Sequence, residues 1–97
     1  MKKLLLGVVM VLLVCFTGFV WAQDVVRIGA NLEMTGAVAA YGQMIWEGVQ
    51  LARELVPEVL GYKVELVLVD NKSDRVEAAN ATTRLIDKEK VVAIIGP

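Results

Sequence analysis

The chain has 97 residues with 10 basic and 11 acidic side chains, contains no histidine, and has a single cysteine, Cys15. Without Lys2 and Lys3, which belong to the leader described next, 8 basic and 11 acidic residues remain, and a net charge of −3 without a basic patch argues against a nucleic-acid partner. The lack of histidine, and of cysteine after residue 15, excludes disulfides, Cys/His zinc sites and nucleophile–histidine catalysis within residues 23–97.

Residues 1–22 have the pattern of a secretion signal. A short basic segment precedes an uncharged apolar run from Leu4 to Val20, and the small residue Ala22 precedes polar Gln23. This order is typical of a signal that is cleaved, here after Ala22. An uncleaved membrane anchor is the alternative, because the apolar run is nearly long enough to span a bilayer. We expect a protein of the periplasm or of the outer side of the cytoplasmic membrane.

Cys15 raises a second alternative, since bacterial lipoproteins are cut directly before a cysteine that then carries lipid. Such sites have a small residue ahead of the cysteine, whereas Val14 stands here. Cleavage there would also leave residues 16–22 as an apolar tether. We therefore interpret Cys15 as a small apolar residue of the signal.

The first half of residues 23–97 predicts a strand, a loop and a helix. Val25 to Leu32 is a β-rich run, interrupted only by Arg27 near its start, and is expected to be buried on both faces. Glu33 to Tyr41 is rich in small residues and reads as a loop. Gly42 to Val56 repeats apolar residues at helical spacing and predicts a helix. Its inward stripe is expected to contain Ile45, Val49, Ala52 and Val56.

The second half predicts a strand, a turn, a helix and a final strand. Tyr62 to Val69 alternates apolar residues with Lys63 and Glu65 at first and then becomes wholly apolar, which predicts a strand, and Asp70 to Asp74 is a polar turn. A helix is expected from Arg75 to Lys88, with Asp74 as its N-cap and Glu77 at the third helical position. Val91 to Ile95 reads as a buried strand. The inward stripe of this helix is expected to contain Val76, Ala79, Thr83 and Ile86.

The β-α-β-α-β order predicts an α/β fold, with a parallel, doubly wound sheet and helices on both faces. The chain stops two residues after the last strand, at Gly96-Pro97, and we expect it to be the N-terminal part of a longer protein. Residues 23–97 would then be an incomplete first lobe.

Ligands of open parallel sheets bind beyond the carboxyl ends of the strands. The loop from Glu33 to Tyr41 is the most informative segment there, because it has small residues, two hydroxyl groups and leads into a helix N-terminus that suits an anion. An ordinary strand–helix connector would have the same small residues, so both readings stay open. The glycine patterns of dinucleotide sites and phosphate loops are absent.

The acidic residues of the turn invite comparison with a calcium loop. Asp70 to Asp74 lacks the glycine and the terminal glutamate of such a loop, and turn formation and helix capping explain both aspartates. Glu33 could meet a ligand ammonium group or be a solvated charge. We expect no metal, no cofactor and no catalytic residue in this stretch.

Several segments, in this order, carry a family resemblance: Thr35-Gly36, Tyr41-Gly42-Gln43, Gly48-Val49-Gln50-Leu51-Ala52, Val69-Asp70-Asn71, Ser73-Asp74, and Val92-Ala93-Ile94-Ile95-Gly96-Pro97. The chain resembles the start of the periplasmic solute-binding proteins of branched-chain amino acid ABC importers. The resemblance implies a monomeric receptor that closes two lobes on an amino acid and delivers it to a membrane permease.

Within that resemblance, Tyr41 maps onto a tyrosine that lines the ligand cleft, and Thr35 occupies a Ser/Thr position of the same loop. Together with Gly42 they are the expected ligand-binding residues. The chain departs from the pattern at Glu33-Met34, where many relatives carry proline, which leaves the substrate open among amino acids, amides, urea and aromatic acids. It departs again at Arg75, where many have proline.

Two further functions stay open from the sequence. The same fold can serve as the ligand-sensing module of a membrane receptor, which an additional transmembrane segment would reveal. An extracellular α/β enzyme would need its active residues beyond Pro97, because nothing before that point suggests a nucleophile, base or metal set.

Overall fold

The computed structural model describes residues 1–16 and 24–97. The predicted cleavage site after Ala22 lies outside these residues. The first element is a helix, α1 (Lys2–Phe16), which contains Cys15. Within the described part of the chain, no helix combines the length and the apolar character needed to cross a membrane. Whether residues 1–22 act as a cleaved signal stays a prediction.

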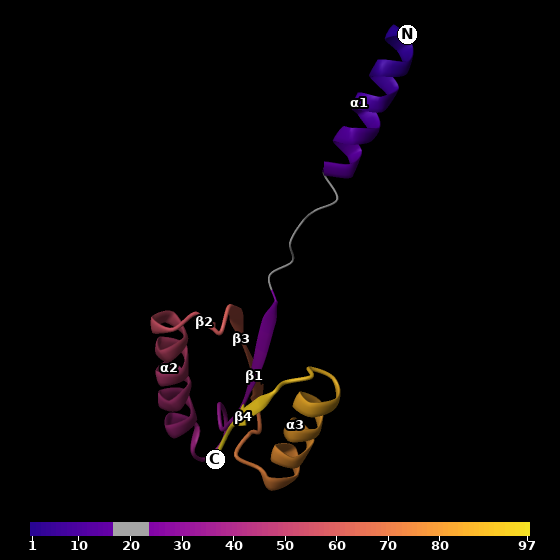
Figure 1. Ribbon diagram of the computed structural model, residues 1–97. Helices are drawn as coiled ribbons and strands as arrows, with labels where there is room; N and C mark the ends of the chain where they lie inside the picture. Colours follow the sequence, from indigo (N-terminus) through magenta and orange to yellow (C-terminus); the bar gives the residue numbers. More distant parts are fainter. Residues whose placement is uncertain (17–23) are drawn as a thin grey trace.

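The remaining elements form one sheet with a helix on each face (Figure 1). They are β1 (Val25–Leu32), α2 (Ala39–Leu55), β2 (Glu58–Val59), β3 (Tyr62–Asp70), α3 (Arg75–Asp87) and β4 (Ala93–Ile95). The strand order is β2-β3-β1-β4, and β1 pairs in parallel with both β3 and β4. The predicted α/β class is confirmed, with a mostly parallel sheet between two helices.

The central strand β1 is buried only in its second half. Val25 and Arg27 are exposed, whereas Gly29 to Leu32 are buried, and Ala30 and Leu32 have no exposed surface. The Arg27 guanidinium lies 3.6 Å from the Glu65 carboxylate and donates to the Glu89 carbonyl. Burial therefore increases toward the carboxyl end of the strand.

The helix α3 packs on β1 and β3 through a different face from the one expected. Its buried residues are Ala81 and Leu85, whereas Val76 and Ile86 are more than half exposed. The cause lies in β1, where Gly29 has no side chain: a Cβ added there would lie 3.0 Å from both terminal carbons of Leu85. Because Leu85 fits over this glycine, the prediction of an inward Val76, Ala79, Thr83 and Ile86 stripe is wrong.

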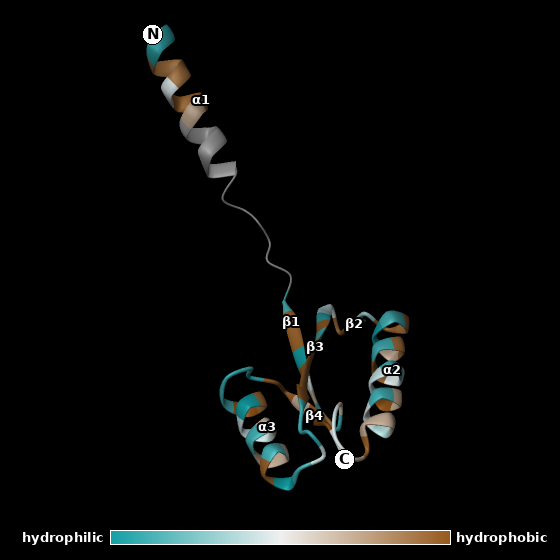
Figure 2. Cartoon of the chain, turned by 180° about the vertical axis from the view of Figure 1, so that it is seen from behind, coloured by the Kyte–Doolittle hydropathy of each residue, from teal (hydrophilic) through white to brown (hydrophobic). Residues whose placement is uncertain are grey.

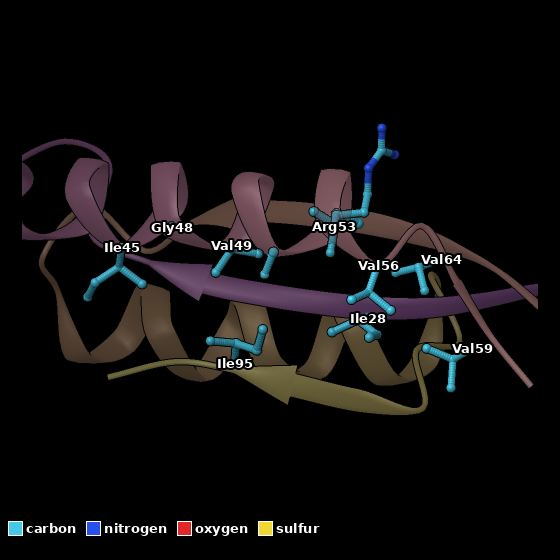
Figure 3. Close-up of a pocket in the computed structure, with 11 residues that line it drawn as sticks. Ile28, Ile45, Gly48, Val49, Arg53, Val56, Val59, Val64 and Ile95 are labelled. Carbon is cyan, nitrogen blue, oxygen red and sulfur yellow. The ribbon is translucent and has the colours of Figure 1, made fainter.

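The helix α2 directs the predicted stripe toward the sheet but stands off from it. Ile45, Val49 and Val56 face Ile28 and Ile95 across an apolar cavity of about 420 Å³ (Figure 3). Ile45 is 42% exposed and Val56 is 56% exposed. Figure 2 shows that α2 has both hydrophobic and hydrophilic stretches along its length, next to the largely hydrophobic middle of the sheet. The orientation of the stripe is therefore as expected, although its burial is incomplete.

One element was not expected, the short strand β2, which pairs antiparallel with β3. Leu60 (φ 52°) and Gly61 (φ 84°) connect the two strands, and both have positive φ. A two-residue hairpin loop requires this backbone, and Asn-Gly or Asp-Gly is its usual sequence signal. Leucine gives no such signal, so the hairpin escaped the prediction of a simple helix-to-strand connection.

Two predicted boundaries also shift. The helix α2 begins at Ala39 rather than Gly42, so Tyr41 lies in its first turn and not in the preceding loop. The last strand begins at Ala93 rather than Val91, although the Val92 N–H already donates to the Arg27 carbonyl. All three residues of β4 are exposed, so the prediction of a buried strand is wrong. A left-handed residue, Lys90 (φ 53°), directs the chain into this strand.

Candidate functional site

Three segments meet at the carboxyl edge of the sheet, as the parallel order requires. They are the loop of residues 33–38 after β1, the turn of residues 71–74 after β3, and Gly96-Pro97 after β4. A cavity of about 210 Å³ lies between them. It is lined by Glu33, Val38, Asn71, Ser73, Asp74, Arg75, Ala78 and Pro97. This cavity is the candidate ligand site.

The carboxylate of Asp70 joins the end of β3 to the loop after β1. It accepts hydrogen bonds from the Met34 N–H (3.0 Å), the Thr35 N–H (3.2 Å) and the Thr35 hydroxyl (2.7 Å). The Lys72 N–H, at 2.8 Å, is a fourth donor. The Thr35 hydroxyl bond is the largest cause of a lowered Asp70 pKa; partial burial opposes it, and the three backbone N–H bonds add to it. Asp70 is therefore an anion bound by both segments.

Two buried asparagines connect the same edge to α3. The Asn71 amide donates to the Asn31 side-chain oxygen (3.0 Å), and the Asn31 amide donates to the Ala78 carbonyl and the Thr82 hydroxyl, both at 3.0 Å. Asn71 is 1% exposed and Asn31 is 5% exposed. Because buried amides without partners are costly, this network fixes how α3 meets the ends of β1 and β3.

Ser73 contacts the loop from the other side of the turn. Its hydroxyl donates to the Thr35 carbonyl (2.8 Å) and accepts the Val38 N–H (3.3 Å). Val38 is the N-cap of α2 and provides no side-chain cap of its own. The start of α2 is therefore held by a side chain from the turn after β3.

Asp74 and Arg75 begin α3 at the wall of the cavity. The Asp74 side chain accepts the Glu77 N–H at 3.0 Å, which confirms the predicted N-cap. The Asp74 N–H donates to the Asn71 carbonyl, so only one half of the expected capping box is formed. With Glu33 on the opposite segment, the residues that line the cavity include both acidic and basic ones.

The three residues predicted to bind ligand lie in different surroundings. Tyr41 is 64% exposed in the first turn of α2. Thr35 is exposed on the loop, with its hydroxyl hydrogen donated to Asp70. Gly42 is buried, and a Cβ added there would collide with the Glu33 backbone carbonyl. Gly42 thus allows α2 to pass close to the end of β1; a ligand contact by any of the three stays a prediction.

Sequence reasoning missed how Asp70, Asn71 and Ser73 act. Asp70 was explained by turn formation, and its bond to the Lys72 N–H is consistent with that. Its bonds to Met34 and Thr35 cross 35 or 36 positions of the chain and have no local signature. The Asp-Asn-x-Ser order directly after a strand was the available signal, because each of these side chains can bond backbone groups nearby.

The larger cavity under α2 is a poor candidate for a polar ligand. Its walls are the inner faces of α2 and the sheet, and Arg53 is the one charged residue that lines it (Figure 3). A zwitterion placed there would lose hydration without gaining partners for both charges. No group of three His, Cys, Asp or Glu side chains that could hold a metal is found in residues 1–16 and 24–97.

Comparisons with known proteins agree with the fold. Residues 25–97 match the family model described as periplasmic binding protein. An amino acid binding protein of Pseudomonas aeruginosa is 34% identical over 76 residues, which are 75% of this chain and 20% of that protein.

Solved structures give the same result. The leucine binding protein LivK of Thermotoga maritima is 59% identical with a TM-score of 0.74, over 75% of this chain and 21% of that one. The branched-chain amino acid transporter substrate binding protein LivJ of Streptococcus pneumoniae, solved with isoleucine, is 40% identical with a TM-score of 0.72, over 76% of this chain and 22% of that one. The chain thus spans about a fifth of the length of these relatives. It belongs to the periplasmic binding protein family.

Proposed function

We propose that the chain is the N-terminal part of an extracytoplasmic receptor of an ABC importer. In this proposal residues 1–22 direct export, and residues 23–97 begin the first of two lobes that close on a small amino acid. A membrane permease then receives the amino acid. Family membership and the names of the relatives, which are amino acid and leucine binding proteins, support this proposal.

The observation that carries the proposal is the cavity at the carboxyl edge of the sheet. Its lining residues include the acidic Glu33 and Asp74 and the basic Arg75. Side chains of both signs suit a zwitterion, whose ammonium and carboxylate groups each need a partner once water is removed. Tyr41, exposed at the nearby start of α2, is proposed as an apolar wall for the ligand side chain. Branched-chain amino acids are the proposed ligands.

Titration calorimetry tests the ligand class on the complete receptor, meaning the full-length secreted protein that is proposed to contain this chain. We expect a heat of binding when leucine, isoleucine or valine is titrated into the receptor. Heat only with another solute, such as an amide or an aromatic acid, would reject the branched-chain assignment and keep the receptor class. No heat with any small solute would reject the receptor.

Replacing Tyr41 by alanine tests its role in the site. We expect ligand affinity to fall at least about tenfold while the melting temperature changes by only a few degrees, because the side chain is 64% exposed and removing it leaves little core unfilled. The matched control is Tyr62→Ala at the opposite end of the sheet, where Tyr62 is 45% exposed. Equal affinities of the two variants would remove Tyr41 from the site.

Export is tested separately. We propose that the mature protein begins at Gln23 and is a monomer outside the cytoplasm. Cell fractionation followed by mass determination of the intact protein checks the first statement, and light scattering checks the second. A mass that retains residues 1–22 would contradict cleavage, and a mass carrying lipid on Cys15 would identify a lipoprotein.

A further inference from the structure

The turn after β3 has an unusual backbone. Lys72 (φ 56°) and Ser73 (φ 58°) are consecutive non-glycine residues in the left-handed region. Such conformations are costly and persist where surrounding bonds over-determine them. Here Asp70 accepts the Lys72 N–H and Asn71 accepts the Ser73 N–H, at 2.8 and 3.0 Å. The side chains of the two preceding residues therefore hold the turn in this shape.

This backbone aims the turn at the loop after β1. Asp70 and Ser73 together bond the N–H groups of Met34, Thr35 and Val38 and the hydroxyl and carbonyl of Thr35. Gly36 (φ 90°) allows the close approach, because a Cβ there would lie 2.5 Å from the Lys72 carbonyl oxygen. We call Asp70, Asn71 and Ser73 the turn latch.

The loop has few other means of keeping its shape. Residues 35–38 are exposed, and most of their side chains are small. Apart from the latch, the Met34 N–H donates to the Leu32 carbonyl, the Ala39 N–H donates to the Gly36 carbonyl, and the Gln43 amide donates to the Met34 carbonyl at 3.3 Å. At the end of the loop, the Val38 carbonyl accepts the N–H groups of Tyr41 and Gly42 in the first turn of α2. With little apolar burial, a loop of this kind opens easily unless hydrogen bonds hold it.

We propose that Asp70 and Ser73 are positioning residues for ligand binding, which fix the loop of residues 34–38 and the first turn of α2 before the ligand arrives. The inference rests on the proposed receptor function. A loop that is already ordered does not lose conformational freedom on binding, so the latch raises affinity without touching the ligand. The lowered pKa of Asp70 is consistent with an anion that the loop stabilises.

Hydrogen exchange and calorimetry on the complete receptor test this inference together. Asp70→Asn replaces an anionic acceptor of four bonds by a neutral amide, and Ser73→Ala removes both of the Ser73 side-chain bonds. In each variant we expect the amides of residues 34–38 to exchange at least about tenfold faster, with those of α3 unchanged. We expect ligand affinity to fall by a similar factor.

Two further variants separate positioning from a general loss of stability. Thr35→Ser keeps the hydroxyl that bonds Asp70 and should leave hydrogen exchange of residues 34–38 as in the wild type, whereas Thr35→Val should make it faster, as Asp70→Asn does. The double variant Thr35→Val with Asp70→Asn should exchange no faster than the faster single variant, because both break the same contact. Asp87→Asn, an exposed aspartate at the end of α3, is the matched control for the lost charge.

Three results would overturn the inference. Unchanged exchange in residues 34–38 of both latch variants would show that the latch does not hold the loop. Faster exchange with unchanged affinity would show that the ligand does not depend on it, and additive increases in exchange in the double variant would show that Thr35 and Asp70 act separately. If the wild-type receptor binds no solute, the proposed function fails, and the exchange rates alone decide whether the latch holds the loop.

Discussion

The two helices cover opposite faces of one sheet in different ways. The helix α3 is capped by its own Asp74 and buries Leu85 completely over Gly29, although a cavity of about 430 Å³ remains between its first half and the end of β4. The helix α2 has no side-chain cap of its own, begins where Ser73 of a distant turn holds it, and leaves a cavity of about 420 Å³ above the sheet. The position of α3 depends on local signals and core packing, whereas the position of α2 depends on hydrogen bonds from elsewhere in the chain.

Replacing Leu85 by alanine should have the largest effect on stability. The side chain is fully buried, so its removal should lower the free energy of unfolding by about 2–5 kcal/mol. The equivalent change in α2, Ile45→Ala, should cost clearly less because Ile45 is 42% exposed and already borders a cavity. Chemical denaturation of both variants measures the difference, and equal losses would contradict the contrast between the two faces.

Adding a methyl group to Gly42 should have the next largest effect. Alanine favours a helix by about 1 kcal/mol over glycine, but a Cβ at Gly42 collides with the Glu33 backbone, and overpacking of this kind costs about 1–3 kcal/mol. Gly48→Ala is the control in the same helix, since no atom lies within 4 Å of its added Cβ. We expect melting temperature to fall in the first variant and to rise in the second.

Removing the cap of α3 should have a smaller effect. Asp74→Ala loses the bond to the Glu77 N–H and should cost about 1 kcal/mol. Hydrogen exchange should become faster in the first turn of α3 and stay unchanged at the start of α2, which a different turn residue holds. Faster exchange at both helix starts would show that the two supports are not separate.

The smallest effect expected is a pH dependence of the loop. The folded-state pKa of Asp70 is lowered from its ordinary value of 3.8. The ionised carboxylate therefore contributes fully to the stability of the loop above pH 3.8, and this contribution is lost as the pH falls through the lower folded-state value. Exchange of residues 34–38, corrected for the intrinsic effect of pH, should therefore be constant from pH 7 to 5 and increase below 3.8. Asp70→Asn should remove this dependence.

The sequence predicted features that depend on local residues better than features that depend on distant partners. The α/β order, the stripe of α2 and the Asp74 cap depend on residues that are close in the chain, and the structure confirms them. The start of α2 at Ala39 and the bonds of Asp70 depend on partners about 35 positions away, which a local pattern does not contain. The inward face of α3 was predicted wrongly because Gly29, on another strand, selects Leu85.

The pairing of β1 has a consequence for the order of folding. Its two partners are β3 and β4, which begin at Tyr62 and Ala93, so the first strand to leave the ribosome waits for most of the following chain before it can enter the sheet. The β2–β3 hairpin closes over two residues and can form within about 1–10 μs. Pairings that are distant in sequence form late, since the entropy of loop closure is lost before their contacts form. The sheet is thus expected to grow from the hairpin at its edge toward β1.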